Sequence, residues 1–129
     1  AVTLSAFQTR AETLWAIYRS EGIEKILRTK LIPRTSSTDS WTTTANQSYF
    51  SANFQPNAIA DQFNSWIDTK LTDGTINKVV AMNLVRDSVD PLKWIVTGTN
   101  NYATSDGTHP GGTGHGLMAT DLRAGVDTI

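Results

Sequence analysis

Segments with helical hydrophobic spacing alternate along this chain with short apolar runs typical of strands, and this alternation limits the possible folds more than any other feature. Helices are predicted over residues 3–20, 56–70 and 112–124, and strands over 25–32, which Pro33 ends, and 76–85. A helix–strand–helix–strand–helix order is typical of an α/β layer with parallel strands. We therefore expect an α/β fold.

The first predicted helix has the clearest pattern. Its apolar residues recur at spacings of three and four, and Ser5 with Gln8 forms a possible capping box. Gly22 follows as a natural C-terminal stop. Residues 91–104, which contain Trp94, predict only an extended segment.

Two strands make a poor sheet, and three amphipathic helices against so little sheet leave apolar stripes uncovered. Residues 1–129 are therefore expected to form a single but incomplete domain, which a companion segment completes. The chain starts at Ala1 without an initiator Met or a signal-peptide pattern, so we expect that segment to lie upstream or on another chain.

Residues 34–48 form the most polar stretch, and it is longer than a routine connection between a strand and a helix. In a doubly wound sheet, the loop after a strand lies where ligands bind. Arg34, Asp39 and Trp41 are therefore predicted to bind substrate. The alternative for each residue is structural: Ser and Thr side chains satisfy the turns, and Trp41 covers the core.

The composition excludes several classes of function. A net charge of −1 gives no electrostatic basis for binding nucleic acid, and no apolar run reaches the length of a membrane span. The absence of cysteine excludes disulfides, thiolate metal sites and cysteine nucleophiles. Many exported proteins also lack cysteine, and a secreted or periplasmic location is the favoured expectation.

The most distinctive local pattern is the run from Ser105 to His115, which places Asp106 and His109 three residues apart on a glycine-rich turn. A carboxylate beside a histidine fixes the imidazole tautomer and stabilises the imidazolium that forms when the ring takes a proton. Pro110 fixes its own φ and favours an extended His109. An Asp-x-x-His pair alone is common, however, and also suits a simple turn.

The extended block resembles the last conserved block of the SGNH/GDSL ester hydrolases. The matching residues are Asp106-Gly107-Thr108-His109-Pro110, Gly114-His115 and Leu117-Met118-Ala119. The resemblance implies the C-terminal half of a flavodoxin-like, three-layer α/β/α fold with parallel strands. It also implies that Asp106 and His109 belong to a Ser-His-Asp triad, without a cofactor, that cleaves a small ester or an acylated carbohydrate. His115 matches a second histidine that is not normally a triad member.

The family's Gly-Asp-Ser block and its oxyanion-hole residues have no counterpart in this sequence. Asp39-Ser40 and Asp87-Ser88 are not preceded by glycine, and no Gly-x-Ser-x-Gly elbow is present. The resemblance therefore implies that the N-terminal half of the same hydrolase, as a separate chain or a missing segment, supplies the serine and the oxyanion hole.

Three other interpretations stay open. One is a non-catalytic carbohydrate-binding α/β module that holds a sugar on Trp41, Trp66 or Trp94. Another is a structural part of a larger assembly. The third is a metal site built from Asp106, His109 and His115, but the two histidines lack the i, i+4 spacing of a zincin, so we expect no metal.

Overall fold

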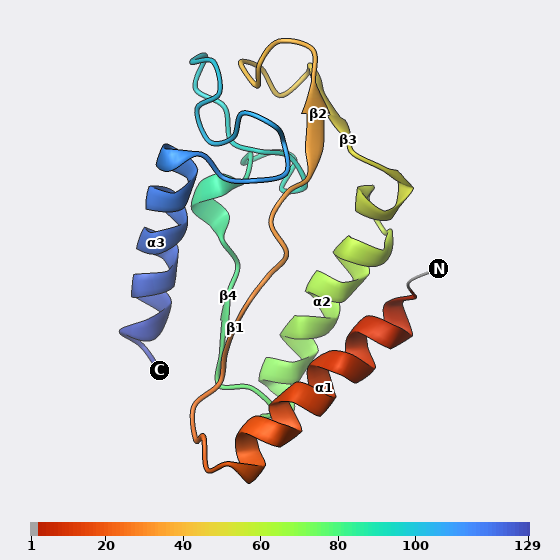
Figure 1. Cartoon of the computed structure of the whole chain (residues 1–129), viewed down its shortest axis with the longest axis vertical. Coiled ribbons are helices and arrows are strands. Elements are labelled where there is room, and N and C mark those ends of the chain that lie inside the picture. The colour runs from red at the N-terminus through yellow and green to blue at the C-terminus, as the bar shows by residue number, and fades with distance from the viewer. Residues whose placement is uncertain (1–2) are drawn as a thin grey trace.

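The computed structural model describes residues 3–129 and shows a mixed α/β fold (Figure 1). The α-helices are α1 (Leu4–Ser20), α2 (Ile59–Thr72) and α3 (Gly112–Val126), and the short 3-10 helices are η1 (Ala52–Phe54) and η2 (Asn83–Val85). The strands are β1 (Leu27–Thr29), β2 (Thr35–Ser37), β3 (Gln47–Tyr49) and β4 (Lys78–Val80).

The centre of the fold is the parallel pair of β1 and β4, in which Arg28 lies opposite Val79. Helix α3 lies on one side of this pair, and α2, with α1 packed on it, lies on the other (Figure 1). Side chains alternate accordingly: Val80 joins the core cluster beneath α3, whereas Val79 packs against the cluster beneath α1 and α2. The predicted parallel strands are thus confirmed, but both are shorter than predicted.

The helix predictions hold with shifted ends. Helix α1 begins one residue later than predicted, and its cap is Thr3, whose hydroxyl accepts a hydrogen bond from the Ala6 amide; the predicted Ser5 capping box is therefore wrong. Gly22 has φ +82°, as expected of a residue that ends a helix in the left-handed region. Helix α2 begins three residues later than predicted and ends at Thr72 instead of residue 70, and α3 ends at Val126 instead of residue 124.

The polar stretch 34–48 is not simply a loop, and this corrects the prediction. Its two ends form an antiparallel pair, β2 with β3, in which Thr35 lies opposite Tyr49. The pattern did not indicate strands because the buried residues of this pair are polar: Thr35 is fully buried and Gln47 is 3% exposed. Downstream, Trp94 is fully buried and forms an isolated antiparallel bridge with Arg86.

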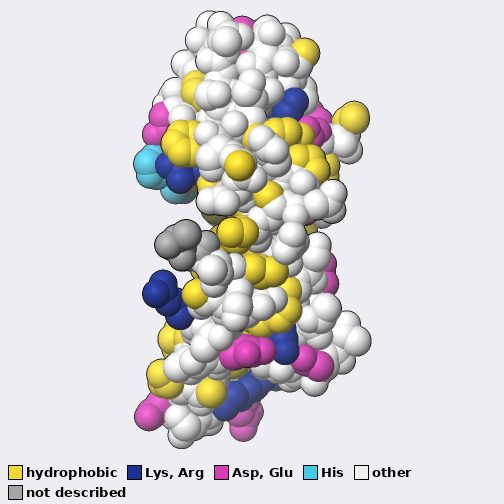
Figure 2. Space-filling model, turned by 90° about the vertical axis from the view of Figure 1, so that its right-hand side faces the viewer, with side chains coloured by type: hydrophobic (Ala, Val, Ile, Leu, Met, Phe, Trp, Pro, Cys, Tyr) yellow, Lys and Arg dark blue, Asp and Glu magenta, His cyan; other side chains and the backbone are white. Residues whose placement is uncertain are grey.

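The outer edge of β1 has no strand partner among residues 3–129. The backbone amide of Lys30 donates to the Val80 carbonyl, so the alternate residues Leu27 and Thr29 direct their backbone groups away from β4. Nearby, the Arg28 Nε is buried without a hydrogen-bond partner among residues 3–129. Helix α1 also leaves large apolar side chains exposed, and hydrophobic atoms are open to view on this side of the molecule (Figure 2). The exposed ones on α1 are Phe7, Leu14, Ile17 and Tyr18.

No helix within residues 3–129 has the length and apolar character needed to cross a membrane.

Candidate functional site

Asp106 and His109 form a hydrogen-bonded pair in the Asp-His turn, which we define as residues 104–110. The imidazole Nδ1 lies 2.7 Å from Asp106 Oδ2. A carboxylate only accepts hydrogen bonds, so the neutral imidazole carries its proton on Nδ1 and presents a free lone pair on Nε2. The imidazole is 78% exposed and the carboxylate 52% exposed. The pair therefore offers an accessible base whose tautomer is fixed.

Backbone amides hold the carboxylate in place. Asp106 Oδ1 accepts hydrogen bonds from the amides of Thr108 and His109, each at 2.8 Å. The pKa of Asp106 lies well below its usual range, chiefly because of the His109 amide, then the imidazole and the Thr108 amide. The carboxylate is thus charged at neutral pH and aligned by its own turn.

Gly107 anchors the base of the turn in the core. Its carbonyl accepts hydrogen bonds from the Thr35 amide and from Trp94 Nε1, both at 2.9 Å. Its own amide donates to Thr104 Oγ1, and that hydroxyl donates to the His109 carbonyl at 2.7 Å. Gly107 has φ +73°, and an added Cβ would lie 1.8 Å from the Thr35 carbonyl oxygen. Only glycine fits this close approach.

Gln47 connects the groups behind Gly107. Its Oε1 accepts from Thr35 Oγ1 and from the Trp94 amide, both at 3.1 Å, and its Nε2 donates to the Trp94 carbonyl at 2.9 Å. Trp41 Nε1 donates to Thr35 Oγ1 at 2.9 Å. Every partner in this network is buried and hydrogen-bonded, an arrangement that makes a buried polar network rigid. The exposed pair therefore stands on a buried, hydrogen-bonded base.

Of the three predicted substrate-binding residues, Arg34 is the one that reaches the turn with its charged group. Its Nε donates to Thr108 Oγ1 at 3.2 Å, and its guanidinium carbon lies 3.8 Å from the centre of the Phe50 ring. Arg34 is half-buried and remains a candidate for contact with a substrate near His109.

Trp41 and Asp39 both serve the structure of the fold: Trp41 lies in the core, and Asp39 is hydrogen-bonded within its own loop. Trp41 is only 9% exposed and packs in the core beneath Gly107, so it does not line an open cleft as predicted. Asp39 accepts hydrogen bonds from its own loop, among them those of Ser37, Thr43 and Asn46. These bonds, with that of Thr43 first, hold the pKa of Asp39 well below its usual range. The carboxylate thus organises its loop.

The other candidate residues form no hydrogen bond with the side chains of Asp106 and His109. His115 is exposed on α3, where its amide donates to the Gly111 carbonyl. Residues 3–129 contain no group of three His, Cys, Asp or Glu side chains arranged to hold a metal ion. Trp94 is buried and so presents no open face to a sugar, whereas Trp66 is half-buried and stacks on Trp15 with ring centres 5.5 Å apart.

Sequence reasoning missed the residues that support the turn: Thr35, Gln47, Trp94 and Thr104. Thr104 lies only three residues from Gly107 and five from His109, so the glycine-rich turn was the local signal for its role. The contacts of Thr35, Gln47 and Trp94 join residues that lie far apart in the sequence.

Comparison with protein-family models found no matching family, and comparison with curated proteins found no significant match.

Proposed function

We propose that this chain is the acid–base half of a serine ester hydrolase of the SGNH/GDSL type. The observation that carries the proposal is the Asp106–His109 pair, in which the carboxylate fixes the ring through Nδ1 and Nε2 is exposed. This is the geometry that a triad requires of its acid and its base. Among residues 3–129, no serine hydroxyl is hydrogen-bonded to His109, so the nucleophile is assigned to a companion segment.

The proposed mechanism uses His109 Nε2 as the base. It takes the proton of the companion's serine hydroxyl as that oxygen attacks the ester carbonyl, and it returns the proton to the alcohol as the ester C–O bond breaks. Water then releases the acyl group by the same proton transfers. Asp106 remains charged and stabilises the transient imidazolium.

The open edge of β1 supports a companion of this kind. Parallel sheets are normally covered on both faces and contain more than two strands. The unpaired backbone of Leu27 and Thr29, the orphaned Arg28 Nε and the exposed apolar face of α1 all suit a further strand with its helix. We accordingly propose that this chain is the C-terminal half of a flavodoxin-like, three-layer domain.

The test compares two histidine variants of the protein isolated with its companion. His109→Ala is expected to abolish hydrolysis of p-nitrophenyl acetate, because the base is lost, whereas His115→Ala is expected to retain it, since His115 lies apart on α3. Intact mass identifies the second polypeptide, and a fluorophosphonate labels its serine. Retention of activity in His109→Ala would remove His109 from the mechanism.

A further inference from the structure

A cavity lined largely by polar residues lies at the carboxyl ends of the parallel strands, and no residue of the Asp-His turn lines it. Its volume is about 280 Å³. Lys30 comes directly after β1, Ala81 directly after β4, and Asn64 and Ser65 lie on α2. Ligands of open α/β sheets bind at this end of the strands.

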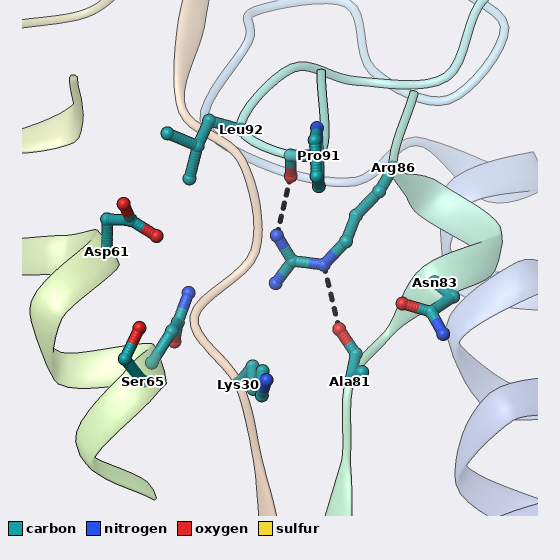
Figure 3. A pocket seen from close by; sticks show the side chains of 9 residues that line it. Lys30, Asp61, Ser65, Ala81, Asn83, Arg86, Pro91 and Leu92 are labelled. Carbon is teal, nitrogen blue, oxygen red and sulfur yellow. Dashed lines mark hydrogen bonds between the residues drawn. The ribbon is translucent and has the colours of Figure 1, made fainter. Parts of the chain in front are cut away.

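Arg86 is the central group of the cavity. It is 8% exposed, and its guanidinium points into the space between α2 and the segment that follows β4 (Figure 3). Three backbone carbonyls accept from it: Nε donates to Ala81 and Nη1 to Pro91, both at 2.7 Å, and Nη2 donates to Leu31 at 2.5 Å. A guanidinium has five N–H donors, so one on each Nη remains free.

The charge of Arg86 is not neutralised at contact distance. No carboxylate of residues 3–129 forms a salt bridge with it. A buried charge is costly unless an opposite charge accompanies it. Burial is the main influence on the pKa of Arg86 and lowers it, while Asp121 and Asp61 act at longer range in the opposite direction. A guanidinium nevertheless stays protonated at neutral pH.

Further donors line the same space. Lys30 Nζ is held at the cavity by Asp68 at 2.7 Å, and the side chains of Ser65 and Asn83 form no hydrogen bond with any other described residue. Asp61 lies across the cavity from Arg86 (Figure 3), and one of its oxygens accepts from the Asn57 amide. The cavity thus combines two cations and free donors with the lining carboxylate of Asp61, while Asp68, outside the lining, pairs with Lys30.

We propose that this cavity is a binding site for a small oxyanion, a phosphate or carboxylate group, held by Arg86 and Lys30. The free Nη donors supply the paired hydrogen bonds that suit such a group. Asp61 opposes a bare anion but accepts a hydroxyl or amine carried by a larger ligand. The site does not depend on the ester hydrolase proposal.

The test is titration of the 129-residue chain with inorganic phosphate and with acetate, followed by amide NMR shifts at constant ionic strength set with chloride. We expect saturable shifts, for at least one of the two anions, at residues around the cavity. The Lys30→Gln variant should bind the anion about tenfold more weakly than the unchanged chain, which is the loss expected for one charge-assisted hydrogen bond. Arg86→Gln is avoided as the main variant because Arg86 also joins three backbone segments.

Two further variants sharpen the test. Lys70→Gln is the matched control, because Lys70 is also a mostly buried, ion-paired lysine but does not line the cavity. It should leave the affinity unchanged. Asp61→Asn keeps an oxygen that can accept from the Asn57 amide and removes the charge that opposes an anion. This variant should therefore bind the anion at least about threefold more tightly than the unchanged chain. Absence of saturable shifts with both anions, or equal effects of Lys30→Gln and Lys70→Gln, would overturn the proposal.

Discussion

Replacement of Gly107 by alanine tests how strongly the core holds the Asp-His turn. A left-handed backbone costs a residue with a Cβ about 1–2 kcal/mol. The new Cβ would also lie 1.8 Å from the Thr35 carbonyl oxygen and 2.7 Å from Trp41 Cζ2, so the turn must move by more than 1 Å to clear the oxygen. That movement breaks the bonds from Thr35 and Trp94 to the Gly107 carbonyl.

Both donors are fully buried, and each one left without a partner costs about 1–3 kcal/mol. With the backbone strain, Gly107→Ala should therefore lose about 3–8 kcal/mol of unfolding free energy, a large part of the roughly 5–15 kcal/mol typical of a domain. Urea unfolding followed by tryptophan fluorescence measures the loss, since Trp41 and Trp94 both adjoin the turn.

Two other glycines separate the contributions. Gly98 has φ +82° but open space around it, so Gly98→Ala should lose only about 1–2 kcal/mol through backbone strain. Gly116 lies within α3 with nothing near its Cβ position, so Gly116→Ala should gain about 0.5–1 kcal/mol. A loss in Gly107→Ala no larger than that in Gly98→Ala would refute the close packing of the turn on Thr35.

Two more predictions concern the support of the turn and its carboxylates. Gln47→Met should lose about 2–5 kcal/mol of unfolding free energy in the same assay, because buried groups of Trp94 and Thr35 lose their hydrogen-bond partners. The control Gln55→Met, at an exposed position, should change the unfolding free energy by less than about 0.5 kcal/mol. Similar losses in the two variants would contradict the network around Gln47. The pKa values of Asp39 and Asp106 are lowered in the folded state, so the two carboxylates stabilise the fold above the ordinary carboxyl pKa of about 3.9, and this stabilisation is lost as the pH falls through the lower folded values. The urea midpoint should therefore fall in acid, and Asp39→Asn should make the midpoint depend less on pH. An unchanged pH dependence in Asp39→Asn would contradict the role of Asp39.

The parts of the fold that the sequence predicted are those determined by neighbours in the chain. The three helices follow from apolar residues at spacings of three and four, and the Asp106–His109 pair joins residues three apart on one turn. The parallel pairing of β1 with β4 also follows from the alternation of elements, although the strands were predicted too long.

The parts that the sequence did not predict depend on distant residues. The β2–β3 pair buries Thr35 and Gln47, so the hydrophobic alternation that signals a strand is absent. Trp41 was predicted to bind substrate because its loop follows a strand, with a place in the core as the alternative; its indole N–H donates to Thr35 inside the core, as the alternative has it. Arg34 and Thr108 are 74 residues apart, and no local pattern indicates their hydrogen bond.

The contrast between the base and the tip of the Asp-His turn bears on the proposed function. The base is buried and hydrogen-bonded through Gly107, whereas the imidazole at the tip is mostly exposed. At an exposed site, water screens the attraction between Asp106 and an imidazolium formed on His109, and the same attraction becomes far stronger where water is excluded. A rigid base beneath an exposed acid–base pair fits the proposed hydrolase. In that proposal the geometry of the pair is already set, and the companion segment would bring both the serine and the low-dielectric surroundings in which Asp106 acts on His109.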